Sequence, residues 1–219
     1  MYHELTRNLS LEQTVRYVIW SWPTEQQGGA LRSVRENVER ANTEAFYLGS
    51  YLATLPADEQ VSLVAFSLGA KVVSGACHLL GGGDIYGRGL PHYERNSHGY
   101  RVVHFSAAVT WSALCHGGLH GKALEVTDGM LNLFNRADKV LRHFQLATRR
   151  RHDEAGGYVG FSVPSEHRHK VEQWDASHML GSEHSWDNVM RNRHLMQQTR
   201  AYLQWQELDK KQAQELAQR

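Results

Sequence analysis

One serine of this chain lies in a sequence that is typical of an activated nucleophile. Ser67 is the central residue of 65–69 (AFSLG), which follows the apolar run 61–66 and precedes a segment of small residues. A strand, a sharp turn and a helix would present the hydroxyl at the edge of a sheet, where it can attack a carbonyl carbon. The residues two before and two after such a serine must be small, and Ala65 and Gly69 meet this demand.

The turn also predicts where the negative charge of a carbonyl addition product would be stabilised. A helix that begins after Ser67 directs its first N–H groups toward the hydroxyl, and the Leu68 N–H is placed to donate to an oxyanion. The alternative interpretation is that Ser67 only caps the following helix, because serine is a favoured residue at that position.

The elements that must position this serine alternate along the chain. Short runs rich in β-branched and aromatic residues alternate with helical patterns, which predicts an α/β protein with a mostly parallel sheet flanked by helices. The strands are expected at 15–22, 61–66, 100–109, 129–135 and 171–175, with a further short extended piece at 159–163. The helices are expected at 34–55, 70–80, 138–148 and 186–208.

Two of these helices carry distinct patterns. Between Val34 and Leu55 the apolar residues recur at steps of four and three, which is one stripe on a helix of about six turns. The segment 70–80 has small residues that allow a close approach to the sheet, and the glycines 81–83 end it. The segment 84–99 is polar and aperiodic, so we expect an exposed loop there.

The strand, the serine turn and the helix of small residues resemble the α/β-hydrolase superfamily in its lipase- and esterase-like branch. The segment 18–25 (VIWSWPTE) is similar to the strand and loop before the long helix in a bacterial, largely uncharacterised part of that superfamily. The resemblance covers residues 15–205. It implies a serine hydrolase that cleaves an ester-like bond (carboxylic ester or thioester) of a small molecule through an acyl-enzyme, with no cofactor.

The resemblance also implies that an acid and a histidine follow the serine in that order. Asp138 directly follows an expected strand and is the candidate acid, with Asp175 as the alternative; Asp138 would otherwise cap the next helix. The candidate base is His184, between a glycine and the last helix, with His178 as the alternative. The chain has 14 histidines, so a surface role for His184 is the competing interpretation.

The chain departs from the family pattern at its beginning. In the family an earlier strand ends in a glycine-rich loop that supplies a second oxyanion N–H, whereas residues 1–14 are typical of a helix. The sequence therefore predicts an α/β-hydrolase-like fold that lacks its N-terminal strand. A truncated start, a rebuilt sheet or a non-catalytic binding or scaffold protein would each explain this, and an unpaired sheet edge would favour a homodimer.

Aromatic residues near the expected strand ends are the candidates for substrate binding. Trp22 and Trp111 are placed to line an acyl pocket, and Phe66 is next to the serine. Most tryptophans at such positions belong to the core, which is the alternative interpretation for Trp22 and Trp111.

The His116–His120 pair has the spacing of metal ligands on one helix turn, but Gly117-Gly118 argues against a helix and no acid follows His116. We therefore expect no metal site.

Composition excludes several other classes of protein. The 219 residues suffice for one core, so we expect one domain over 1–208 and a polar tail at 209–219. A net charge of +1 argues against a nucleic-acid partner. No apolar run is long enough for a transmembrane helix, and the first residues do not resemble a secretory signal. We interpret Cys77 and Cys115 as reduced residues of a cytoplasmic protein.

Overall fold

The computed structural model describes residues 2–7, 14–23, 30–91, 99–148 and 153–204. The helices are α1 (Tyr2–Thr6), α2 (Ala30–Leu52), α3 (Gly69–Leu80), α4 (Gln145–Thr148), α5 (Gly156–Val159), α6 (Ser177–Leu180), α7 (Trp186–Arg191) and α8 (Arg193–Leu203). The strands are β1 (Val61–Phe66), β2 (Tyr100–Phe105), β3 (Thr127–Phe134) and β4 (Val171–Asp175). Short 3₁₀ turns occur at Ala123–Glu125, Leu141–His143 and Ser165–Lys170.

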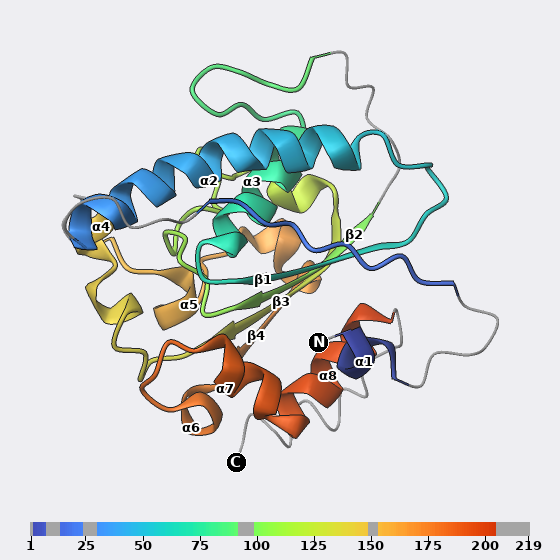
Figure 1. Ribbon diagram of the computed structural model, residues 1–219. Coiled ribbons are helices and arrows are strands. Elements are labelled where there is room, and N and C mark those ends of the chain that lie inside the picture. The colour runs from blue at the N-terminus through green and yellow to red at the C-terminus, as the bar shows by residue number, and fades with distance from the viewer. Residues whose placement is uncertain (1, 8–13, 24–29, 92–98, 149–152, 205–219) are drawn as a thin grey trace.

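The four strands form one parallel sheet in the order β1-β2-β3-β4. Each strand is joined to the next by a crossover, so all carboxyl ends lie at the same edge of the sheet. Figure 1 shows α4, α5 and α7 gathered near that edge. The predicted α/β class with a mostly parallel, helix-flanked sheet is confirmed.

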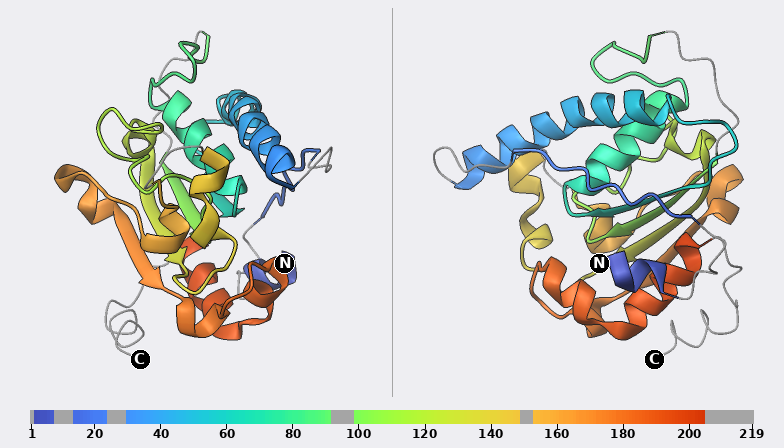
Figure 2. Two further views of the ribbon diagram at one scale, coloured as in Figure 1. Left: turned by 90° about the vertical axis from the view of Figure 1, so that its left-hand side faces the viewer. Right: turned by 45° about the vertical axis from the view of Figure 1, so that its right-hand side comes forward.

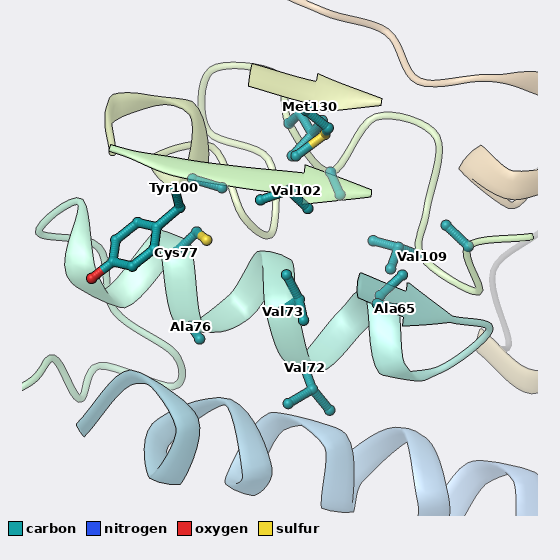
Figure 3. Close-up of a cluster of buried hydrophobic side chains, with 14 of the residues drawn as sticks. Ala65, Val72, Val73, Ala76, Cys77, Tyr100, Val102, Val109 and Met130 are labelled. Carbon is teal, nitrogen blue, oxygen red and sulfur yellow. The ribbon is translucent and has the colours of Figure 1, made fainter. Parts of the chain in front are cut away.

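Helices cover both faces of the sheet. Helices α2 and α3 lie on one face, and α1, α6, α7 and α8 lie on the other (Figures 1 and 2). The face under α3 is closed by a cluster that includes Val73, Cys77, Val102 and Met130, which meet between the helix and the strands (Figure 3). Because α3 is covered on one side by the sheet and on the other by α2, almost every one of its residues is buried.

The predicted strands 61–66, 100–109, 129–135 and 171–175 and the predicted helices 34–55 and 70–80 are found, with differences at some of their ends, whereas other predicted elements differ in kind. The strands 61–66 and 171–175 coincide with β1 and β4. The apolar stripe of α2 is buried at Ala41, Ala45 and Leu48, but the helix ends at Leu52 and not at Leu55. The expected single helix 138–148 is a 3₁₀ turn followed by α4. The expected extended piece 159–163 begins with the last residue of the short helix α5, and its other residues belong to no strand.

The last predicted helix, 186–208, is interrupted within the described residues. Asn192 has φ −80° and ψ +96°, and its side chain accepts a hydrogen bond from the Leu195 N–H. It therefore ends α7 and caps α8, which turns the second helix back under the sheet. Asparagine is a favoured N-cap because its side-chain oxygen satisfies a free N–H of the first turn.

The prediction of a strand at 15–22 is wrong. The segment 14–23 has no regular secondary structure and is not part of the sheet, and Val18 and Ile19 expose 51% and 71% of their surface. It is anchored to α2, where the Trp20 indole donates to Glu44 and Arg40 donates to the Pro23 carbonyl. In Figures 1 and 2 this dark-blue segment passes along α2. Its β-branched residues therefore face solvent while its tryptophans contact the core.

Some expectations fall partly or wholly outside the described residues. These include the tail 209–219, part of the loop 84–99 and the end of the segment 18–25. Cys77 and Cys115 carry free thiols, and burial raises the pKa of Cys77 to about 12. Among the described helices, none combines the length and the apolar character that crossing a membrane requires.

Candidate active site

Ser67 occupies a strained turn between β1 and α3. Its φ is +55°, a left-handed conformation that non-glycine residues rarely adopt. Backbone bonds hold the turn on both sides: the Ser67 N–H donates to the Phe105 carbonyl, and the Ser67 carbonyl accepts from Ala70 and Ala108. The N-cap of α3 is Leu68 and no side chain caps the helix, so Ser67 does not have the capping role that was the alternative.

His184 reaches Ser67 from a loop between α6 and α7. Its Nε2 lies 2.8 Å from the Ser67 Oγ, and its Nδ1 lies 2.6 Å from the Asp138 Oδ2. The loop turns at Gly181, which has a φ of +65°. It is tied to the loop after β3, because Asn135 donates to the Gly181 carbonyl. The loops that carry the acid and the histidine are therefore joined independently of the side-chain pair.

Asp138 uses its two carboxylate oxygens for different purposes. Oδ2 faces His184, whereas Oδ1 accepts from the N–H groups of Val140 and Leu141 at 2.9 and 3.0 Å. The side chain is fully buried. Burial by itself would raise the pKa of Asp138, but the hydrogen bonds from His184 and from the two N–H groups outweigh it and leave the pKa lowered. Both interpretations of Asp138, as partner of the histidine and as helix cap, therefore describe the same side chain.

An aromatic contact fixes the plane of the His184 ring. The Phe66 ring lies 4.7 Å from the imidazole, centre to centre, at an interplanar angle of 32°. Phe66 also contacts Trp186, the first residue of α7. Of the three candidate substrate contacts, Phe66 is thus the one that lies against the histidine. A packed ring on one face restricts rotation of the imidazole about its side-chain bonds.

The Leu68 N–H is free to donate at the start of α3. Among the described residues none accepts a hydrogen bond from it, and Leu68 has helical torsion angles of −63° and −21°. The positive end of the α3 dipole lies here, which favours negative charge beside Ser67. We assign no second oxyanion donor within the described parts of the chain.

The alternative acid and base lie elsewhere. Asp175 is partly exposed and accepts hydrogen bonds from the N–H and hydroxyl of Ser177, at the start of α6. It also lies 3.6 Å from the Arg136 guanidinium. His178 is exposed on α6. The geometry therefore brings together Ser67, His184 and Asp138 and leaves both alternatives on the surface.

The two candidate tryptophans occupy different places. Trp22 lies beside the turn at Ser67, since its indole is 3.8 Å from the position that a Cβ on Gly69 would take. Its Nε1 is buried and has no hydrogen-bond partner among the residues that the structure describes. Trp111 lines a separate hollow with Phe134 and Phe161, and no residue of the serine, histidine and aspartate group lines that hollow.

Sequence reasoning missed the wall that α5 forms beside the serine. Tyr158 and Leu68 pack on one cluster with Ala108, and the Gly157 carbonyl accepts from the Asn135 N–H. A Cβ on Gly157 would lie 1.9 Å from the Ala107 nitrogen, so only glycine allows this close approach. The signal in the sequence is the pair Gly156-Gly157, two adjacent residues without side chains.

The described residues contain no group of three or more His, Cys, Asp or Glu side chains arranged to hold a metal ion. His116 instead pairs with Glu166 on the surface, and His120 is buried against Ser74. Comparison of this chain with protein-family models, with curated proteins and with solved structures gave no match.

Proposed function

We propose that this protein is a serine hydrolase that cleaves an ester-like bond of a small molecule. The observation that carries the proposal is the chain of contacts from the Asp138 carboxylate through His184 to the Ser67 hydroxyl, at 2.6 and 2.8 Å, on a strained turn at the carboxyl end of β1. Three side chains that are far apart in the sequence meet at one end of a parallel sheet, where α/β proteins place their ligands.

In the proposed reaction His184 accepts the Ser67 proton as the serine oxygen attacks the carbonyl carbon. Asp138 keeps the histidine proton on Nδ1, so that the Nε2 lone pair faces the hydroxyl. The carbonyl oxygen becomes an oxyanion and takes the hydrogen bond of the Leu68 N–H. His184 then gives its proton to the leaving alcohol or thiol, and the acyl group stays on Ser67.

Water completes the cycle in the same geometry. His184 takes a proton from a water molecule that attacks the acyl carbon, and the second oxyanion collapses with return of the proton to Ser67. No step needs a cofactor. The proposal extends to carboxylic esters and to thioesters, since both present the same carbonyl to the serine.

A second candidate is a non-catalytic binding or scaffold protein with a hydrolase-like fold. The observation in its favour is that the segment 14–23 does not join the sheet, and that no second oxyanion donor is assigned in the described chain. Loss of one such donor lowers the rate by about 10²–10³. This candidate predicts a folded protein with an unreactive serine.

Labelling with a fluorophosphonate probe tests the proposal, together with hydrolysis of p-nitrophenyl acetate. We expect labelling of the wild type and its loss in Ser67→Ala and in His184→Ala, with a fall in kcat of about 10⁴-fold or more. His178→Ala and Asp175→Asn are matched controls that should keep labelling and turnover. A cooperatively folded wild type that is neither labelled nor active would establish the second candidate instead.

A further inference from the structure

A hollow of about 490 Å³ lies on the α3 face of the sheet, beside β4. It is lined by Trp111, Phe134, Glu154, Val159, Gly160, Phe161, Ser162 and Gln173. Phe134 ends β3 and Gln173 belongs to β4, while Glu154 and the residues 159–162 supply most of the remaining lining. The volume falls in the range of small-molecule sites, and the lining is mainly apolar, as such sites are.

Three aromatic residues, Trp111, Phe134 and Phe161, line this hollow. Trp111 leaves 40% of its surface exposed, whereas Phe161 is almost completely buried. Phe134 already contacts a cation, since the Arg136 guanidinium lies 5.5 Å from its ring centre. Arg136 does not line the hollow. The electron-rich faces of tryptophan and phenylalanine attract cations, and tryptophan does so most strongly.

Most polar groups of the hollow are already occupied. The Gln173 amide bonds to both the N–H and the carbonyl of Phe161, and its oxygen also accepts from Asn132. The Ser162 N–H donates to the Trp111 carbonyl. The remaining charged group is the Glu154 carboxylate, which is exposed and has no ion-pair partner among the described residues. A sugar would find few free donors and acceptors here.

We propose that this hollow binds a small organic cation, of the alkylammonium or quaternary ammonium class. The aromatic rings supply the apolar and cation–π contacts, and Glu154 supplies the opposite charge. Arg168 does not line this hollow. It lines an adjoining one, which shares Phe161, Ser162 and Gln173 with it.

The site is separate from the serine and does not depend on the proposed hydrolase function. Helix α5 stands between the two: Tyr158 packs on the cluster that contains Leu68, and the next residue, Val159, lines the hollow. Binding can therefore be measured in a Ser67→Ala protein, in which no turnover interferes.

The test compares choline with 3,3-dimethylbutan-1-ol, its neutral isostere, by calorimetric titration of the full chain carrying Ser67→Ala. We expect choline to bind at least about fivefold more tightly than the neutral compound. Glu154→Gln should raise the Kd of choline about fivefold and leave that of the neutral isostere within about twofold. Trp111→Leu should also weaken choline, whereas Glu59→Gln, an exposed control outside the hollow, should change neither Kd.

Three results would overturn the proposal. The first is equal affinity for choline and its neutral isostere, which would mean that the hollow takes apolar groups without regard to charge. The second is an unchanged choline Kd in both Glu154→Gln and Trp111→Leu, which would place choline elsewhere. The third is no choline binding at 50-fold excess over about 1 mM protein, with each variant melting cooperatively like the wild type.

Discussion

Replacing Asp138 by asparagine separates its two roles, because the surrounding donors decide how the new amide must lie. The N–H groups of Val140 and Leu141 both point at Oδ1, so the amide oxygen must take that position. The amide NH₂ then faces His184 Nδ1, where the carboxylate oxygen lay. An NH₂ group donates, so Nδ1 must accept and the histidine proton moves to Nε2. The nitrogen next to Ser67 can then no longer take the serine proton.

The expected magnitudes differ for activity and for stability. A wrong histidine tautomer lowers kcat by about 10⁴-fold. The free energy of unfolding should change by only about 1 kcal/mol in Asp138→Asn, because the cap is kept. Asp138→Ala removes the acceptor from two N–H groups in a fully buried place, which should cost about 2–4 kcal/mol. Both variants should lose activity, and the alanine variant should lose more of the free energy of unfolding than the asparagine variant.

Two measurements check this reasoning at pH 7: kcat on p-nitrophenyl acetate, and the free energy of unfolding from urea titration. An asparagine variant that keeps more than about a tenth of the wild-type kcat would refute the tautomer argument. Equal unfolding free energies for the asparagine and alanine variants would refute the capping argument. The pKa of Asp138 is lowered, so the stability it provides should be present at neutral pH and be lost as pH falls through its folded pKa, below 3.8.

Two further predictions concern stability alone. Burial lowers the pKa of His104 to about 3, and both of its ring nitrogens are buried with no hydrogen-bond partner in the described parts of the chain. Its folded pKa lies below its unfolded pKa, so the free energy of unfolding should fall by about 1.4 kcal/mol per pH unit as the pH drops from about 6.5 to about 3. His104→Leu should remove this contribution to the pH dependence, measured by urea titration at several pH values. An unchanged pH dependence in the variant would contradict the prediction. Gly157→Ala should lower the free energy of unfolding by about 2–4 kcal/mol, measured by thermal melting, because the alanine Cβ would meet backbone atoms of Ser106 and Ala107. Gly49→Ala, where a Cβ meets nothing closer than 3.4 Å, should be neutral or stabilising; equal losses would contradict the argument.

Strands and helices with a regular apolar pattern could be predicted because the pattern itself shows which face of the element is covered. The run 61–66 pairs with β2 on one side and contacts α3, and the buried part of the α2 stripe lies against α3. The segment 15–22 has the same composition as a strand, but composition does not say whether a neighbouring strand is available. There the tryptophans contact the core and α2, and the backbone pairs with no strand.

The three side chains of the candidate site could be selected because their local sequences are those of strand ends and turns. Ser67, Asp138 and His184 each follow a strand or precede a helix, and parallel strands bring such places to one edge. The wall formed by α5 could not be predicted in the same way. Its position depends on contacts distant in sequence, such as the bond from Asn132 to the Gly156 carbonyl and that from Asn135 to the Gly157 carbonyl.

The strained turn at Ser67 is held in part by a second strained turn at Ser106. Ser106, directly after β2, also has a positive φ of +45° and is almost completely buried. Each serine adds one backbone hydrogen bond to those between the parallel strands: the Ser67 N–H donates to the Phe105 carbonyl, and the Ser106 N–H donates to the Leu133 carbonyl. The turn at Ser106 brings the Ala108 N–H back to the Ser67 carbonyl at 3.0 Å. The strained backbone at the candidate nucleophile therefore rests on a second strained turn in the neighbouring strand, and the sheet register holds both.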